Sequence, residues 1–108
     1  MPLGRNSLRM AQRGEEKTAR QIGGRLQPAS GATPFAKGDV KSPELLVERK
    51  DTAGRSYSLK AAELLKIRQQ AILADRIPVF IVALNGSNPP LEVAVVDSSY
   101  LFNLLGLE

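Results

Sequence analysis

An uninterrupted apolar run late in the chain places the strongest constraint on the fold. Residues 77–84 (Ile-Pro-Val-Phe-Ile-Val-Ala-Leu) have the pattern of a fully buried β-strand, with Pro78 near its start, where a missing backbone N–H is tolerated. A second apolar strand is expected at Leu45–Lys50, and a long helix with Ser58 as its N-cap, ending near Asp75, is expected between the two. A helix that connects two strands of one sheet makes a right-handed crossover and leaves the strands parallel. The sequence therefore predicts a β-α-β unit at the centre of the fold.

The flanking segments extend this unit into an α/β fold with a mixed β-sheet flanked by helices. Residues 1–13 are polar, basic and punctuated by glycine, and we interpret them as a flexible basic arm that precedes a single domain over residues 14–108. The other expected elements are, in chain order, an amphipathic helix from Gly14 to about Gln27, a loop over residues 28–38, a hairpin over residues 39–50, turns over residues 51–54 and 85–90, a strand over residues 91–97 and a short helix over residues 98–105. The resulting α-β-β-β-α-β order, with one further strand and helix, is that of an α/β sandwich.

The residue types that the chain lacks restrict its chemistry. Its 108 residues include neither cysteine nor histidine. Disulfide scaffolds, cysteine-type zinc sites and thiol nucleophiles are therefore excluded. Histidine-zinc hydrolases and an imidazole general base are excluded as well. A hydrolase built on this chain must use carboxylates, lysine, hydroxyl groups and bound metal.

The basic residues are concentrated in the first two thirds of the chain. Residues 1–41 contain eight Lys and Arg against three acidic residues, whereas residues 77–108 contain three acidic residues and no Lys or Arg. A nucleic acid is the natural partner of such a surface, because cationic side chains release counterions from phosphates. A solubilising surface or a basic disordered tail is the alternative. The candidate DNA contacts are Arg5, Arg9, Arg13, Lys17, Ser30, Lys37, Lys41 and Lys60.

An acidic residue at a turn precedes the strand that carries Glu48 and Lys50. Because successive side chains of a strand alternate between its faces, Glu48 and Lys50 project to one side, and Arg49 projects to the other. A hairpin through Ser42-Pro43 would bring Asp39 beside them, so that two carboxylates suited to Mg²⁺ or Mn²⁺ meet a lysine. This layout is that of a metal-dependent nuclease site.

The spacing of acid and lysine is not specific by itself. The same spacing occurs at Glu15–Lys17 and at Asp39–Lys41, and only the copy at Glu48–Lys50 lies on an apolar strand. The alternative interpretation is a solvated ion pair on an exposed face of the sheet.

Taken in order, these features resemble the PD-(D/E)XK nuclease superfamily and, within it, the small Holliday junction resolvases of archaea and phages. The resemblance covers about Gly14 to Leu84 and rests on Gly14-Glu15-Glu16, Ser30-Gly31-Ala32, Lys37-Gly38-Asp39-Val40, Glu48-Arg49-Lys50 and Pro78-Val79-Phe80-Ile81. It implies a restriction-endonuclease-like core and a divalent-metal-dependent endonuclease that hydrolyses DNA phosphodiesters in recombination or repair. It also implies a homodimer that cuts two strands across a four-way junction.

The resemblance implies a role for each site residue. Asp39 and Glu48 would ligate Mg²⁺ or Mn²⁺, with the backbone carbonyl of Arg49 as a further ligand, and Lys50 would position or activate the attacking water. A helix glutamate would complete the site, with Glu15 as the candidate and Glu16 as the alternate. Ser30 matches a loop serine that lies beside the scissile phosphate.

Two residues depart from the family pattern. Glycine rather than proline precedes Asp39, and the charged Arg49 stands where an apolar residue is usual, which predicts that its side of the strand is exposed, at an edge of the sheet or against DNA. The alternative functions are cleavage of other branched or duplex DNA, DNA binding without catalysis on the same fold, and a structural role. The apolar segment at residues 100–105 would supply the dimer contact or close the core of the monomer.

The chain has neither a run of membrane-spanning length nor an apolar core of the signal-peptide kind at its N-terminus. We therefore expect a cytoplasmic protein, in the host cytoplasm if a phage encodes it, with no membrane partner and no small-molecule substrate.

Overall fold

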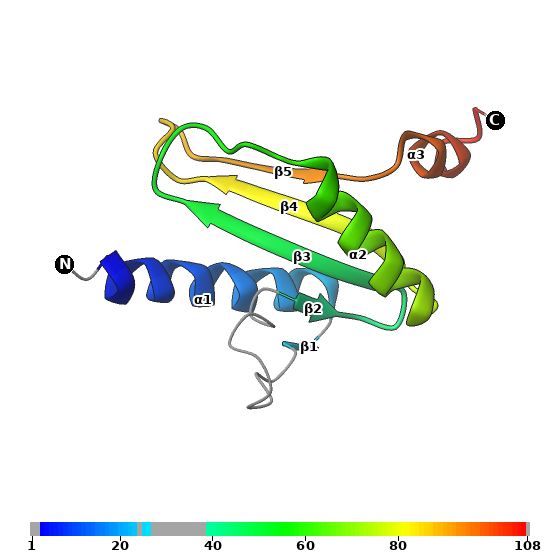
Figure 1. The fold of residues 1–108 in the computed structure, drawn as a ribbon, viewed down its shortest axis with the longest axis horizontal. Helices are drawn as coiled ribbons and strands as arrows, with labels where there is room; N and C mark the ends of the chain where they lie inside the picture. The colour runs from blue at the N-terminus through cyan, green and yellow to red at the C-terminus, as the bar shows by residue number, and fades with distance from the viewer. Residues whose placement is uncertain (1–2, 24, 27–38, 108) are drawn as a thin grey trace.

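The computed structural model describes residues 3–23, 25–26 and 39–107, and within them it contains three helices and one mixed sheet of five strands (Figure 1). The elements in chain order are α1 (Leu3–Ile22), β1 (Arg25–Leu26), β2 (Asp39–Lys41), β3 (Leu45–Thr52), α2 (Ala61–Leu73), β4 (Ile77–Leu84), β5 (Leu91–Val95) and α3 (Ser98–Leu104). The strands lie in the sheet in chain order, with β3 and β4 parallel and the other neighbours antiparallel. The predicted α/β fold with a mixed sheet flanked by helices is confirmed.

The β-α-β unit at the centre of the fold has the predicted pairing. The helix α2 connects β3 to β4, and these strands pair in parallel from Leu45 opposite Ile77 to Thr52 opposite Leu84. The strand β4 has the bounds that its apolar run predicts. The strand β3, which carries Glu48 and Lys50, lies in the middle of the sheet between β2 and β4.

The first helix is longer at its start and shorter at its end than the sequence predicts. Residues 3–13 belong to α1, so the expected change from arm to helix at Gly14 does not occur. Leucine, arginine, methionine, alanine and glutamine, which favour helices, fill much of residues 3–13 and extend the helix toward the N-terminus. The helix ends at Ile22 rather than near Gln27, because Gly23 takes a left-handed conformation with a φ of 67°, as is common just after a helix.

The start of α2 also differs from the prediction. Lys60, and not Ser58, is the N-cap, and the helix ends at Leu73 rather than near Asp75. The carboxylate of Glu63 accepts a hydrogen bond of 3.2 Å from the backbone N–H of Lys60, as the acidic residue of a capping box does. This contact fixes the first turn of α2 two residues later than a serine cap would.

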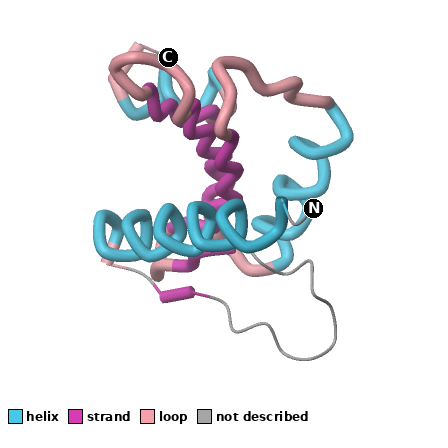
Figure 2. Tube along the Cα trace, turned by 90° about the vertical axis from the view of Figure 1, so that its left-hand side faces the viewer, coloured by secondary structure: helices cyan, strands magenta, loops and turns pink. Residues whose placement is uncertain are grey.

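The two faces of the sheet pack against different helices. On one face, Ala19 of α1 packs with Val40, Val47 and Val79 of the sheet. On the other face, the core consists of Leu46, Ile67, Ala71, Phe80 and Val82, with Ile67 and Ala71 contributed by α2. Figure 2 shows the strands as a narrow central column with the helices arranged around them. We call these the α1 face and the α2 face of the sheet.

The last helix, α3, lies beyond the end of β5 and away from the sheet (Figure 1). Its apolar side chains are exposed, including Phe102 at 44% and Leu104 at 67%. They therefore do not close the core of the described chain, which was one of the two expectations for this segment. Within the described residues, no helix has both the length and the apolar character required to cross a membrane.

Candidate functional site

Glu48 and Lys50 meet on the α2 face of β3, as the alternation of a strand predicts. The Nζ atom of Lys50 lies 3.5 Å from Oε2 of Glu48. Their strand neighbour Leu46 belongs to the core beneath α2, which places all three on the same face. Both side chains reach solvent, with exposed fractions of 42% for Lys50 and 19% for Glu48. The strand thus holds a carboxylate and an ammonium group side by side at an accessible position.

Asp39 lies directly across from Glu48 in the sheet. β2 and β3 form the predicted antiparallel hairpin, and its register pairs Asp39 with Glu48. The connecting turn is held by Ser42, whose Oγ accepts a hydrogen bond of 2.9 Å from the backbone N–H of Leu45. Directly paired residues of an antiparallel ladder stand on the same face. The side chain of Asp39 lies outside the described part of the structure, and among the side chains that are described no group of three acidic residues could hold a metal ion.

Two residues that the sequence did not single out lie close to this pair. The Tyr57 hydroxyl donates a hydrogen bond of 2.5 Å to Oε2 of Glu63, and the Tyr57 ring packs at 6.2 Å from the ring of Phe80. Burial, followed by the hydrogen bond to Glu63 and the charges of Glu63 and Glu48, raises the pKa of Tyr57. The hydrogen bond from Tyr57 is the largest effect on Glu63 and lowers its pKa, with help from the backbone of Lys60 and the charge of Lys50. Neither residue gave a signal in the sequence, because the capping-box pattern has Ser or Thr at the N-cap, where this chain has Lys60.

The lowered pKa of Glu63 predicts a stability that depends on pH. Because the pKa is lower in the folded chain, the ionised carboxylate stabilises the fold above the unfolded pKa, and this contribution is lost as the pH falls through the folded pKa. Glu63→Gln should therefore lower the free energy of unfolding by at most about 1 kcal/mol at pH 7, because the side chain is partly exposed and solvent screens its interactions. As the pH falls below the unfolded pKa and through the lowered folded pKa of Glu63, this difference should shrink, because the carboxylate becomes protonated in the parent chain.

Chemical denaturation at a series of pH values measures this effect. Glu44→Gln is the matched control, since Glu44 is an exposed residue of the hairpin turn whose side chain has no partner among the described residues. A Glu63→Gln deficit that stays constant down to pH 3 would show that the ionised carboxylate is not responsible.

Arg49 does not lie where its charge led us to expect. The expectation of an exposed, edge or DNA-facing position is wrong, because Arg49 is 5% exposed on the central strand, against α1. Its Nε and one terminal nitrogen donate to the two carboxylate oxygens of Asp51 at 2.9 and 3.0 Å. The same terminal nitrogen lies 2.9 Å from Glu92 of β5, and the other donates to the Thr18 hydroxyl of α1 at 3.0 Å. Arginine can be buried here because each side of the guanidinium group has a partner.

The partners of Arg49 also decide its ionisation. Desolvation lowers the pKa of Arg49, but the hydrogen bonds and charges of Asp51 and Glu92 outweigh it, so that the net shift is upward. Gly14 of α1 lies against this group, since a Cβ atom there would overlap Nε of Arg49 and Oδ2 of Asp51. The network therefore joins α1, β3 and β5 on the α1 face.

The structure divides the other predicted site residues between the two faces. The helix that carries Glu15 and Glu16 covers the α1 face, whereas Glu48 and Lys50 lie on the α2 face, so the described geometry does not bring the helix glutamate together with them. Arg9, Arg13 and Lys17 also belong to α1. Lys41 is paired with the α2-face residue Leu46, and Lys60 caps α2.

Three predicted DNA contacts cannot be placed in full. Ser30 and Lys37 lie outside the described residues, and Arg5 is described only as part of the helical backbone of α1.

Comparison of the chain with protein-family models, with curated proteins and with solved structures finds no match in any of the three.

Proposed function

We propose that this chain is a divalent-metal-dependent DNA endonuclease with a restriction-endonuclease-like core, acting on four-way DNA junctions. The observation that carries the proposal is the register of β2 and β3. This register sets Asp39 across from Glu48, while Lys50 lies 3.5 Å from Glu48 on the same face. Two acidic residues on neighbouring strands can bind a divalent metal, and the lysine beside them can stabilise charge on the phosphate. Metal-dependent hydrolysis of a phosphodiester uses residues of these types.

The order of elements gives further support. The helix α1, three strands, α2 and the parallel strand β4 follow in the α-β-β-β-α-β order that the family resemblance implies. The acidic positions lie on the two central hairpin strands of this unit. The chain thus shares with those nucleases the order of its elements and the positions of Asp39, Glu48 and Lys50 on them.

The chemistry divides among residues of the α2 face. Asp39 and Glu48, with the carbonyl of Arg49, would hold Mg²⁺ or Mn²⁺, which when bound supplies positive charge at the reacting phosphate and a more acidic water. Lys50 would orient the attacking water and stabilise charge on the phosphorus oxygens. Its contact with Glu48 holds the ammonium group beside the phosphate position. Lys41 and Lys60, near the same face, would bind neighbouring phosphates of the DNA backbone.

A homodimer would account for the apolar C-terminal helix. Phe102, Leu104 and Leu105 of this segment are exposed at 44%, 67% and 61%, and an apolar surface of this kind is characteristic of a protein contact. Two chains related by a two-fold axis would present two hydrolytic sites, which is the arrangement that symmetric cleavage of a junction requires.

A cleavage assay tests the function. The purified protein is incubated with matched four-way junction, flap, duplex and single-stranded DNA in Mg²⁺, Mn²⁺ or chelator, with Glu48→Ala as the inactive variant. We expect paired, symmetric nicks confined to the junction, which are lost in chelator and in the variant.

The other outcomes are equally informative. Cleavage of flap or duplex DNA would support the proposed nuclease activity but contradict the proposed specificity for four-way junctions. Tight DNA binding without cleavage in any metal would assign the chain to the non-catalytic DNA-binding class, and cleavage that survives Glu48→Ala would exclude the proposed site.

A further inference from the structure

The outward side of α1 carries a row of arginine residues. Along the helix, Arg9, Arg13 and Arg20 are separated by four and seven residues. Because an α-helix has 3.6 residues per turn, these separations place the three side chains on one side of the helix. All three residues are exposed. We call them the arginine row of α1.

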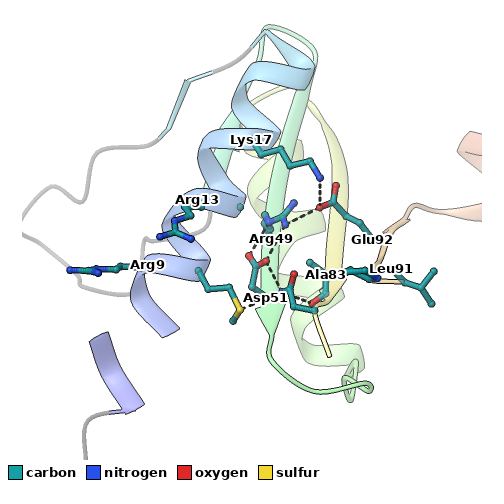
Figure 3. A pocket seen from close by; sticks show the side chains of 12 residues that line it. Arg9, Arg13, Lys17, Arg49, Asp51, Ala83, Leu91 and Glu92 are labelled. Atoms are coloured by element: carbon teal, nitrogen blue, oxygen red, sulfur yellow. Dashed lines mark hydrogen bonds and ion pairs between the residues drawn. The ribbon is translucent and has the colours of Figure 1, made fainter. Parts of the chain in front are cut away.

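The arginine row faces away from the sheet. Gly14 and Thr18 lie on the opposite side of α1 and are buried against the network that joins this helix to β3 and β5. Figure 3 shows Arg9 and Arg13 on the side of the helix away from Glu92 of that network. The guanidinium groups therefore point toward solvent, where they are accessible to a large partner.

Ion pairs do not neutralise the charge of the row. Among the described residues, none of Arg9, Arg13 and Arg20 has an ion-pair partner. Glu16 lies between Arg13 and Arg20 on the same side of the helix and offsets one of the three charges. A net positive charge remains on this surface. Exposed guanidinium groups form strong, charge-assisted hydrogen bonds with phosphate groups, so a chain of phosphates suits this row.

The composition of α1 favours duplex DNA as the source of these phosphates. The helix contains no aromatic residue on which the bases of a single strand would stack. A membrane would require an apolar side that is turned outward, whereas Ala19 and Ile22 of α1 pack against the sheet. At about 1.5 Å per residue, the row extends over about 16 Å of helix axis. Each strand of duplex DNA places a phosphate about every 3.4 Å along its axis, so the row can contact several phosphates.

Buried contacts fix the position of the row. The Thr18 hydroxyl accepts a hydrogen bond of 3.0 Å from Arg49 of β3. Gly14 allows a close approach, since a Cβ atom there would overlap Arg49 and Asp51. Both contacts anchor α1 to the sheet at points between the first and last arginine of the row. A surface that is already held in place loses less entropy when it binds a partner.

We propose that the arginine row binds the phosphate backbone of a duplex DNA segment other than the one that is cleaved. The row faces outward from the α1 face, whereas Glu48 and Lys50 lie on the α2 face. A duplex that lies along α1 is therefore separated by the sheet from the proposed hydrolytic site. In a four-way junction, this segment would be an arm that is held away from the cut. DNA binding by the row depends only on α1, but its separation from the cut rests on the proposed function.

Fluorescence anisotropy of a short labelled duplex, with the full chain in chelator and over a series of salt concentrations, tests the binding. Arg9→Gln with Arg13→Gln should weaken binding at low salt by about tenfold or more and reduce the slope of log affinity against log salt by about two. Arg20→Gln alone should reduce this slope by about one. Arg55→Gln with Lys66→Gln is the matched control, because it removes the same charge at exposed positions outside the row and should leave the slope unchanged.

The binding result stands whether or not the chain cleaves DNA. An unchanged slope in the variant of Arg9 and Arg13, or an equal loss in the matched control, would overturn DNA binding by the row without affecting the nuclease proposal. If this variant loses binding to vesicles that contain anionic lipid, while its binding to the duplex is unchanged, the row is a membrane contact and the proposal is wrong.

Single-turnover cleavage of a four-way junction tests the separation of the two DNA segments. At saturating protein, the variant of Arg9 and Arg13 should cleave within about twofold of the parent rate, although it needs a higher protein concentration to reach saturation. A rate that stays low at saturation would show that the row acts on the cleaved segment, which contradicts the proposal. If the parent chain cleaves no junction, the proposed function fails and the separation fails with it, whereas the anisotropy measurement still decides whether the row binds DNA.

Discussion

Arg49→Ala is expected to lower the free energy of unfolding by about 3–5 kcal/mol, because it leaves the buried carboxylate of Asp51 without its cation. The Asp51 side chain is 3% exposed, and both of its oxygens accept hydrogen bonds from the guanidinium group. Glu92 of β5 and Thr18 of α1 lose a partner in the same variant. Urea denaturation followed by circular dichroism measures the change. For a chain of 108 residues this effect is a large fraction of the total stability, so partial unfolding at room temperature is an expected result.

Arg55→Ala is the matched control for this measurement, since Arg55 is an exposed residue just after β3 with no ion-pair partner among the described residues. It should change stability by no more than about 0.5 kcal/mol. A double-mutant cycle of Arg49→Ala and Asp51→Ala should show coupling of about 1 kcal/mol or more, since the two side chains share one network. Equal stability of the Arg49 and Arg55 variants would mean that the buried network does not hold α1 and β5 to the sheet.

Lys50→Ala is expected to reduce junction cleavage by about 10²–10³-fold while the chain still folds and binds junction DNA. The ammonium group lies on the accessible α2 face beside Glu48, and its loss removes positive charge at the proposed phosphate position. The side chain is 42% exposed, so its removal leaves no buried charge unpaired and should change stability little. Single-turnover cleavage in Mg²⁺ and junction binding in Ca²⁺ are measured on the same preparation.

Two variants separate the role of Lys50 from a general loss of charge. Lys66→Ala removes an exposed lysine of α2 and should leave cleavage within about twofold of the parent chain. Lys50→Arg keeps the charge with another geometry and should retain an intermediate rate. If Lys50→Ala cleaves normally, the proposed role is excluded, whereas parallel loss of cleavage, binding and fold would mean that Lys50 is structural.

The proposed hydrolytic site and the buried network of Arg49 lie on opposite faces of one small sheet. Arg49 connects them, because it follows Glu48 and precedes Lys50 on β3 while its side chain lies on the α1 face. The buried network on the α1 face thus fixes the strand that positions Glu48 and Lys50 on the α2 face.

The positions of Asp39, Glu48 and Lys50 could be predicted from the sequence, because they depend only on the geometry of one hairpin. Glu48 and Lys50 share a face because side chains alternate along any strand, and Asp39 reaches the position opposite Glu48 because a Ser-Pro turn of fixed length joins the two strands. The hydrogen bond of Tyr57 to Glu63 joins residues that are also close in sequence, but it requires the loop before α2 to fold back onto Phe80.

The sequence alone determined the α/β class, the parallel pairing of β3 and β4, and the common face of Glu48 and Lys50, because these follow from apolar patterns and from the period of two in a strand. Only the tertiary structure decided that Arg49 is buried and that α1, with Glu15, covers the opposite face. The burial of a charge depends on partners that are distant in sequence, here Thr18 on α1 and Glu92 on β5, and no local pattern shows that they converge. The physical reason is that periodicity fixes which residues of one element share a face, whereas only the packing of several elements determines what that face meets.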